Sequence, residues 1–160
     1  MRKFEKISFE QFKKDVCNDK ELYNSILVPK RSTNNSAGYD IRSIEDYLLR
    51  THTSHVFKTG IKVSMNKNEV LYIFDRSSFG FKYDIMLSNS VGVIDSDYYN
   101  NEDNEGHICV KLFNMGDTDV EIHKGDRIAQ CIFMKYLTVD DEEEINNKRK
   151  GGIGSTGKGK

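Results

Sequence analysis

Short apolar runs separated by turn-forming residues are the main feature of this 160-residue chain. The runs are rich in Ile, Val, Tyr and Phe, and clusters of Gly, Asn and Asp lie between them. Pro29 is the only proline, so glycine and Asx residues must form most of the turns. This alternation is typical of an antiparallel sandwich or barrel. We expect strands at residues 38–41, 56–63, 69–74, 91–94, 107–113, 118–122 and 127–136.

The N-terminal residues are the one place where we expect a helix. Ser8 and Gln11 match a capping box, which predicts a short helix from residue 9 to about residue 16. We interpret residues 1–25 as a strand-and-helix extension of a single domain. That domain is expected to cover residues 1–145, a length sufficient to bury a sizeable core.

Composition and charge exclude several classes of function. The net charge of −1 gives no basic field that would favour nucleic acid or an anionic membrane surface. No apolar run approaches the length of a membrane span, and the first residues lack the apolar core of a signal peptide. Cys17, Cys109 and Cys131 show no metal-ligand spacing, so we expect reduced thiols in a cytoplasmic protein.

The C-terminal residues change in composition. The acidic run at residues 140–144 indicates a solvated linker to a flexible arm at residues 146–160, which ends in GGIGSTGKGK. A P-loop would need Ser or Thr at position 159, which would ligate magnesium, but Gly159 stands there. Two interpretations remain open: a disordered tail, or a flap that closes on phosphates bound elsewhere.

Four polar, glycine-containing segments lie within the β-rich region. DRSSFG (75–80) combines a cation with two hydroxyls, a grouping that can bind an anion. In GVIDSDYYN (92–100), an apolar strand runs into two carboxylates and an aromatic ring, which indicates either a cleft or an Asx turn. AGYDI (37–41) and GDRIAQ (125–130) indicate only turns when each is taken alone.

Taken together, these four segments and GGIGSTG (151–157) resemble the five motifs of the trimeric dUTPases in order and spacing. The resemblance covers roughly residues 26–160. It implies an all-β, jelly-roll-like subunit in a homotrimer that has three active sites at the subunit interfaces. It also implies hydrolysis of dUTP to dUMP and pyrophosphate with Mg²⁺ as the cofactor.

The resemblance also implies individual roles. Asp95 would be the base that activates water at the α-phosphate, and Tyr98 would stack on deoxyribose and exclude a 2′-hydroxyl. Asp40 would hold Mg²⁺ through water, with the metal mainly on the phosphates. The uracil would be read by Asn89 and by the backbone of Gly92, Val93 and Ile94. The phosphates would be bound by Arg76, Ser77, Ser78, Gln130 and, from the arm, by Lys148 or Arg149, Gly152, Ile153, Gly154, Ser155 and Thr156.

The chain departs from the family pattern at several positions. Asp75 replaces a common proline, which predicts a less rigid turn before Arg76. Ile153 stands where the arm often carries an aromatic residue that stacks on uracil, and the loop at residues 100–106 is longer than usual. We therefore interpret His107, which follows this loop, as a replacement lid over the base.

Two alternatives remain. A dCTP deaminase resembles this family in fold, but it needs a glutamate base where this chain has Lys111. A regulatory protein that captures a partner would use the helix at residues 9–16 and the loop at residues 100–106. Both alternatives assign a different task to the same scaffold.

Overall fold

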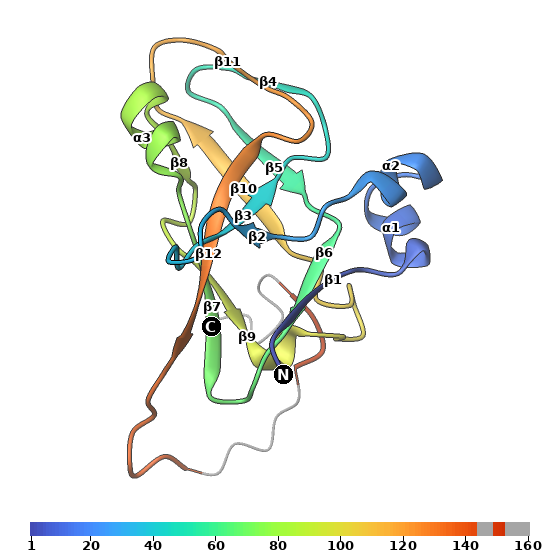
Figure 1. Ribbon diagram of the computed structural model, residues 1–160, viewed down its shortest axis with the longest axis vertical. Helices are drawn as coiled ribbons and strands as arrows, with labels where there is room; N and C mark the ends of the chain where they lie inside the picture. Colours follow the sequence, from blue (N-terminus) through green and yellow to red (C-terminus); the bar gives the residue numbers. More distant parts are fainter. Residues whose placement is uncertain (144–148, 153–160) are drawn as a thin grey trace, which may run out of the picture.

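The computed structural model describes residues 1–143 and 149–152. Across these residues the chain forms twelve strands, and every ladder between them is antiparallel. The strands form four sheets around a common apolar core, with short helices at the periphery (Figure 1). The prediction of an all-β fold is therefore confirmed.

The largest sheet in the described part of the chain has five strands. Their order is β2 (Lys30–Arg31), β3 (Tyr39–Arg42), β12 (Arg127–Lys135), β7 (Glu69–Phe74) and β9 (Gly92–Asp95). Strand β9 therefore lies at an edge and pairs only with β7 among the described strands. Backbone N–H and C=O groups on its other side remain available to a ligand.

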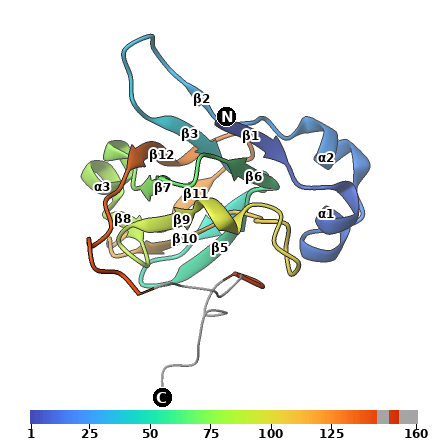
Figure 2. The same ribbon diagram turned by 90° about the horizontal axis from the view of Figure 1, so that it is seen from below.

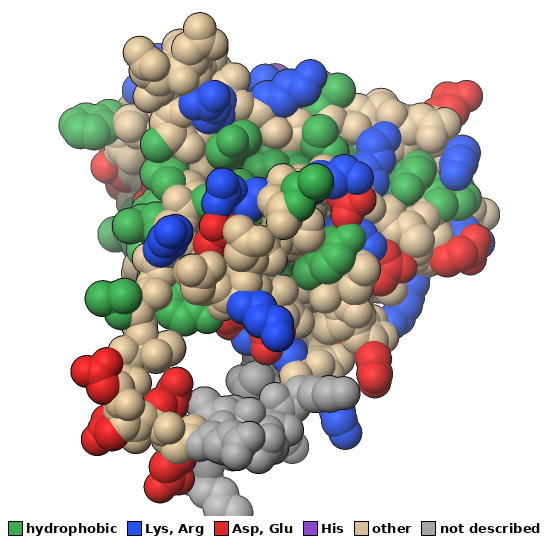
Figure 3. All heavy atoms as spheres, turned by 60° about the horizontal axis from the view of Figure 1, so that its bottom comes forward, with side chains coloured by type: hydrophobic (Ala, Val, Ile, Leu, Met, Phe, Trp, Pro, Cys, Tyr) green, Lys and Arg blue, Asp and Glu red, His purple; other side chains and the backbone are tan. Residues whose placement is uncertain are grey.

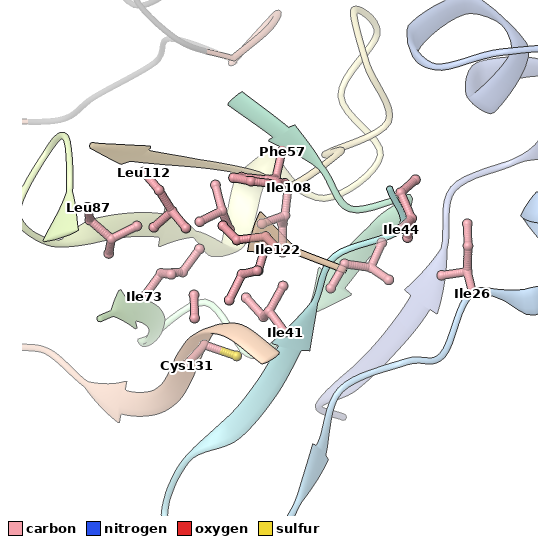
Figure 4. Close-up of a cluster of buried hydrophobic side chains, with 14 of the residues drawn as sticks. Ile26, Ile41, Ile44, Phe57, Ile73, Leu87, Ile108, Leu112, Ile122 and Cys131 are labelled. Carbon is pink, nitrogen blue, oxygen red and sulfur yellow. The ribbon is translucent and has the colours of Figure 1, made fainter. Parts of the chain in front are cut away.

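Three smaller sheets complete the barrel. One contains β5 (Ser54–Lys58), β10 (Cys109–Asn114) and β8 (Ile85–Leu87). The other two are the pairs β1 (Lys3–Lys6) with β6 (Ile61–Ser64), and β4 (Tyr47–Leu49) with β11 (Val120–Ile122). Alternate side chains from these sheets meet in the core, where Ile73 of β7 lies near Leu87 and Leu112 (Figure 4).

Two helices near the N-terminus lie together on one side of the barrel (Figure 1). The predicted helix is confirmed as α1 (Phe9–Asp15), and the unpredicted α2 (Lys20–Ser25) follows it. Ser8 caps α1, because its Oγ accepts the Gln11 N–H at 3.1 Å. The second half of the capping box differs from expectation: Glu105, rather than Gln11, accepts the Ser8 N–H.

Several other elements differ from the sequence-based expectation. The predicted strand at 56–63 is broken at Gly60, which has a φ of +71° and separates β5 from β6. Strand β1 lies in the extension at residues 1–25, where a strand was expected. Strands β2, β4 and β8 were not predicted, and each has only two or three residues. The DRSSFG segment forms the start of a helix, α3 (Ser77–Tyr83), in place of a turn. A 3₁₀ turn, η1 (Ser96–Tyr98), follows β9.

The acidic residues after β12 are exposed and lack regular secondary structure as far as residue 143. Figure 3 shows their carboxylates gathered at one corner of the molecule. This exposure agrees with the solvated linker expected there. In the residues that the structure describes, no helix is both long enough and apolar enough to span a membrane.

Candidate active site

The residues implied by the five motifs line two separate cavities of this chain. The first, the Asp95 cavity, has a volume of about 560 Å³, and the second, the arginine cavity, about 210 Å³. The two cavities share no lining residue. The Asp95 cavity contains Asn89, Gly92, Val93, Ile94, Asp95, Tyr98, His107, Arg149 and Gly152. The arginine cavity contains Asp40, Arg76, Ser77, Ser78 and Gln130.

Edge strand β9 forms one wall of the Asp95 cavity and ends at Asp95. The buried Gly92 begins the strand, and a Cβ atom at this position would lie 3.0 Å from Cβ of Ile73. Glycine therefore allows the edge to pack closely on β7. Asn89, from the turn between β8 and β9, lies in the same cavity. The wall thus presents backbone donors and acceptors beside one side-chain amide, a combination suited to reading the edge of a planar base.

Asp95 is well placed to contact both solvent and a ligand. Its side chain is 49% exposed, and it forms an ion pair with Arg149. The same guanidinium contacts Asp97, with Nε 2.7 Å from Oδ1. Arg149 therefore bridges the two carboxylates of the IDSDY segment, and this residue of the arm lines the Asp95 cavity.

Tyr98 is held firmly by its hydroxyl group. The hydroxyl donates to the carbonyl of His107 at 3.0 Å and accepts from Nδ2 of Asn104 at 2.8 Å. Burial raises the pKa of Tyr98, which keeps this donor protonated. Gly152 lies against the ring, since a Cβ atom there would be 3.1 Å from the hydroxyl oxygen. The aromatic ring thus has a fixed place in the cavity.

The interpretation of His107 as a lid is wrong. Its side chain is only 1% exposed, so the ring is covered by protein. Nδ1 lies 2.7 Å from Oδ2 of Asp15, and Nε2 accepts the Gly60 N–H at 2.9 Å. With both ring nitrogens bound internally, His107 cannot close over a base. Sequence reasoning missed this because nothing in the loop composition reveals burial.

The arginine cavity is organised around the carboxylate of Asp40. Asp40 Oδ1 lies 3.6 Å from Nε of Arg76, and Oδ2 lies 3.4 Å from a guanidinium nitrogen of Arg127. Ser32 Oγ also donates to Oδ2, at 2.8 Å. Two guanidinium groups at one carboxylate leave donors free for an anion. Sequence reasoning missed Arg127, although it lies within the GDRIAQ motif.

Gln130 and Asp75 fix the turn between β7 and α3. Nε2 of Gln130 donates to the carbonyl of Asp75 at 2.9 Å, and the Asp75 carboxylate accepts the Leu87 N–H. A proline could not make the second contact. The aspartate thus anchors the turn to β8, a contact that the expectation of a less rigid turn did not include. Gly38 packs against Gln130, since a Cβ atom there would be 2.8 Å from Oε1.

Some implied residues cannot be placed. The arm residues Lys148, Ile153, Gly154, Ser155 and Thr156 lie outside the residues that the structure describes. The Asp95 cavity also contains polar side chains that the motifs did not assign to the site. These are Lys58, Asp103, Asn104, Cys109 and Lys111. Most of them come from the 100–106 loop and β10, where spacing alone gave no functional signal.

Comparison with known proteins identifies the family. A family model described as dUTPase matches residues 24–157. A deoxyuridine 5′-triphosphate nucleotidohydrolase of Lactococcus lactis is 49% identical over 133 residues, which cover 82% of this chain and 89% of the relative. One from Helicobacter pylori is 30% identical over 141 residues, covering 86% of this chain and 93% of the relative.

Solved structures agree with this assignment. A dUTPase crystal structure from Streptococcus mutans has a TM-score of 0.70 and 42% identity, covering 86% of this chain and 98% of the other. A dUTPase from phage phi11 of S. aureus, at 19% identity and a TM-score of 0.67, supports the fold alone; the match covers 92% of this chain and 97% of the other. On this evidence the chain belongs to the dUTPase family and is a hydrolase that converts dUTP to dUMP.

Proposed function

We propose that Asp95 is the general base of a magnesium-assisted attack by water on the α-phosphate of dUTP. The supporting observation is its position, at the end of edge strand β9 and beside Tyr98 in a cavity of about 560 Å³. Asp95 would take the proton of the water as its oxygen bonds to the α-phosphorus, and pyrophosphate would leave. The half-exposed carboxylate leaves room for that water.

Base and sugar recognition would take place in the Asp95 cavity. The free edge of β9, from Gly92 to Ile94, would pair with uracil as a neighbouring strand would, and Asn89 would complete the pattern of donors and acceptors. A fixed pattern rejects cytosine, because the mismatched polar groups would be left unpaired. The ring of Tyr98 would lie under deoxyribose and leave no room for a 2′-hydroxyl.

Phosphate binding would use Arg76, Ser77, Ser78 and Gln130 of the arginine cavity. In the complex, phosphate oxygens would compete with Asp40 for the guanidinium groups. The arm would add Gly152, Ile153, Gly154, Ser155 and Thr156, with Lys148 or Arg149 at the γ-phosphate. For Arg149 this requires release of Asp95, which would also free the base to accept a proton.

Magnesium fits this arrangement in a limited way. In the described residues, no group of three or more His, Cys, Asp or Glu side chains could hold a metal ion alone. Asp40 offers one carboxylate, which suits Mg²⁺ because this ion is often held by one or two carboxylates together with substrate phosphates. When bound, the ion would neutralise phosphate charge. Asp40 would hold it through water.

We also propose a homotrimer in which the active site is shared between copies. One dUTP molecule must contact both the base-reading wall and the phosphate-binding arginine, but these lie in separate cavities of one chain. Apposition of two copies would join one cavity of each type. Phe81 on α3, whose neighbours Arg76 and Ser77 belong to the arginine cavity, is 94% exposed and would be covered by such a contact.

Mixing two inactive variants tests this sharing directly. Asp95→Asn and Arg76→Ala should each be inactive, and subunits of the two variants can be denatured together and refolded. If sites form between copies, about one quarter of the sites in an equal mixture would hold both intact residues, and activity should return. A mixture that stays inactive, with a trimeric mass by light scattering, would contradict the shared site.

The deaminase alternative finds no support in the geometry. Lys111 lines the Asp95 cavity at the position where a deaminase needs a carboxylate base. An ammonium group cannot accept the proton in that reaction. Pyrophosphate release from dUTP, compared with ammonia release from dCTP, separates the two activities.

A further inference from the structure

The N-terminal extension, residues 1–25, is bound to the loop at residues 99–107, which we name the sugar-side loop. Almost all of this extension precedes the region matched by the family model. We propose that Asp15 and His107 are positioning residues through which the extension fixes Tyr98 and thereby sets selectivity against ribonucleotides. This inference rests on the proposed contact of Tyr98 with deoxyribose.

Hydrogen bonds join the N-terminal extension to several residues of the sugar-side loop. Glu105 accepts both the N–H of Ser8 at 2.9 Å and its hydroxyl at 2.5 Å. Lys14 Nζ donates to the carbonyl of Asp103 at 3.0 Å, and the Tyr99 hydroxyl donates to Glu5. Figure 2 shows the loop beside α1, on the side of the barrel that carries the extension. The loop is therefore supported by residues that are remote in sequence.

His107 is the most deeply buried of these contacts. The Gly60 N–H can only donate, so Nε2 of His107 must be the unprotonated nitrogen. Nδ1 then carries the proton and donates to the Asp15 carboxylate at 2.7 Å. This is a charge-assisted hydrogen bond from a neutral imidazole, and it fixes the orientation of the ring.

The position of His107 is transmitted to Tyr98 through the backbone. The carbonyl of His107 accepts the Tyr98 hydroxyl, and Nδ2 of Asn104 donates to the hydroxyl oxygen of Tyr98. Asn101 holds the other end, because its Nδ2 donates to the carbonyl of Tyr98 at 2.8 Å. Gly106 has a φ of +84°, and a Cβ atom there would be 2.6 Å from the Tyr98 carbonyl oxygen. The loop and Tyr98 must therefore move together.

Steric exclusion of the 2′-hydroxyl of a ribonucleotide depends on the exact position of the Tyr98 ring. A displacement of about 1 Å at a positioned group can change rate by about 100-fold. Loosening the loop should therefore admit UTP before it prevents turnover of dUTP. The expected result is a loss of selectivity with a smaller loss of dUTP hydrolysis.

Four variants separate positioning from general stability. Asp15→Ala removes the acceptor for His107, whereas Asp15→Asn keeps one. His107→Gln places an amide oxygen near the position of Nε2, so it keeps the Gly60 contact and loses the Asp15 contact. Asp19→Ala is the matched control. The Asp19 side chain caps α2 by accepting the Leu22 N–H, so its removal weakens that helix without removing a contact to the loop.

The measured quantity is the ratio of kcat/KM for dUTP to kcat/KM for UTP, with hydrogen exchange of the 99–107 peptide alongside it. Asp15→Ala and His107→Gln should lower the ratio about tenfold and speed exchange of the loop. Asp15→Asn should keep most of the ratio, and Asp19→Ala should lower Tm with the ratio unchanged. If Asp15→Ala does not fold, the dUTP-to-UTP ratio of His107→Gln tests the inference alone.

Tyr98→Ala separates the two levels of the argument. If it changes the ratio while Asp15→Ala and His107→Gln do not, this inference fails and the proposed role of Tyr98 stands. If Tyr98→Ala leaves the ratio unchanged, the role of Tyr98 fails and the inference fails with it. An equal loss of selectivity in Asp19→Ala would show that general destabilisation is the cause, and would also overturn the inference.

Discussion

The two cavities hold their functional groups in different ways. In the Asp95 cavity, Tyr98 and the β9 edge are held by backbone pairing and by hydrogen bonds of neutral groups. In the arginine cavity, Arg76 and Arg127 are held mainly by the charge of Asp40. The first arrangement fixes the position of a ring and a strand edge. In the second, a phosphate can replace Asp40 as the partner of the two guanidinium groups. Discrimination between bases and between sugars should therefore depend on the Asp95 cavity, and affinity for phosphate should depend on the arginine cavity.

The largest expected effect comes from the chemical step in the Asp95 cavity. Asp95→Asn keeps the shape of the side chain and removes the base, so kcat for dUTP should fall by about 100- to 10,000-fold. Binding of dUMP should change little. Stopped-flow measurement of pyrophosphate release, with calorimetric titration of dUMP, checks both statements; a near-normal kcat would rule out Asp95 as the base.

Deleting residues 151–160 should have the next largest effect and would sharpen the division between the cavities. If the arm supplies phosphate contacts, turnover of dUTP should fall by about 100- to 1,000-fold. Uracil and sugar recognition should survive, so dUMP should still bind. A disordered tail predicts the opposite result, in which the truncated protein hydrolyses dUTP as fast as the full chain.

Tyr98→Ala should have a moderate effect that is confined to selectivity. Space opened under the sugar should lower the dUTP-to-UTP ratio of kcat/KM by about tenfold. Tyr98→Phe is the matched control, because it keeps the ring and removes only the hydroxyl contacts to His107 and Asn104. Its ratio should fall less. A full loss in Tyr98→Phe would mean that the ring excludes a 2′-hydroxyl only while its own hydroxyl holds it in place.

The smallest expected effect is a pH-dependent loss of stability on the Asp95 side. Burial is the main cause that lowers the pKa of His107 below 6.5, and the charge of Lys58 also lowers this pKa. The carboxylates of Asp15 and Glu105 raise it, but by less. Because the folded pKa is depressed, the unfolded chain binds the proton more readily. Stability is therefore fully present above pH 6.5 and falls as pH drops toward the folded pKa.

Chemical denaturation at pH 7 and pH 5 measures this loss. Each pH unit between the unfolded and folded pKa values is worth about 1.4 kcal/mol of unfolding free energy. His107→Gln cannot titrate and should lose less stability over the same range. An equal loss in the variant would assign the effect to other groups, such as the carboxylates, which become protonated at lower pH.

The resemblance to the family selected the motif residues, and the structure brings part of each set together. Asp95, Tyr98 and Asn89 line one cavity, and Arg76 and Asp40 line the other. Their roles in catalysis and binding stay predictions. The sequence could not predict the burial of His107, since its partner Asp15 lies 92 residues away. The sequence also did not predict α3, because its seven residues include Gly80 and give only a weak helical pattern.

The contact between Ser8 and Glu105 joins residues that are 97 positions apart, and this separation has a consequence for synthesis. The extension leaves the ribosome first, and its partners follow about 5–20 seconds later at ordinary elongation rates. With seven residues, α1 is too short to persist alone in the meantime. Pulse-labelled hydrogen exchange during refolding should show the 99–107 amides protected after those of β7 and β12. A nascent chain would thus assemble its barrel first and form last the loop contacts to which we assign selectivity against ribonucleotides.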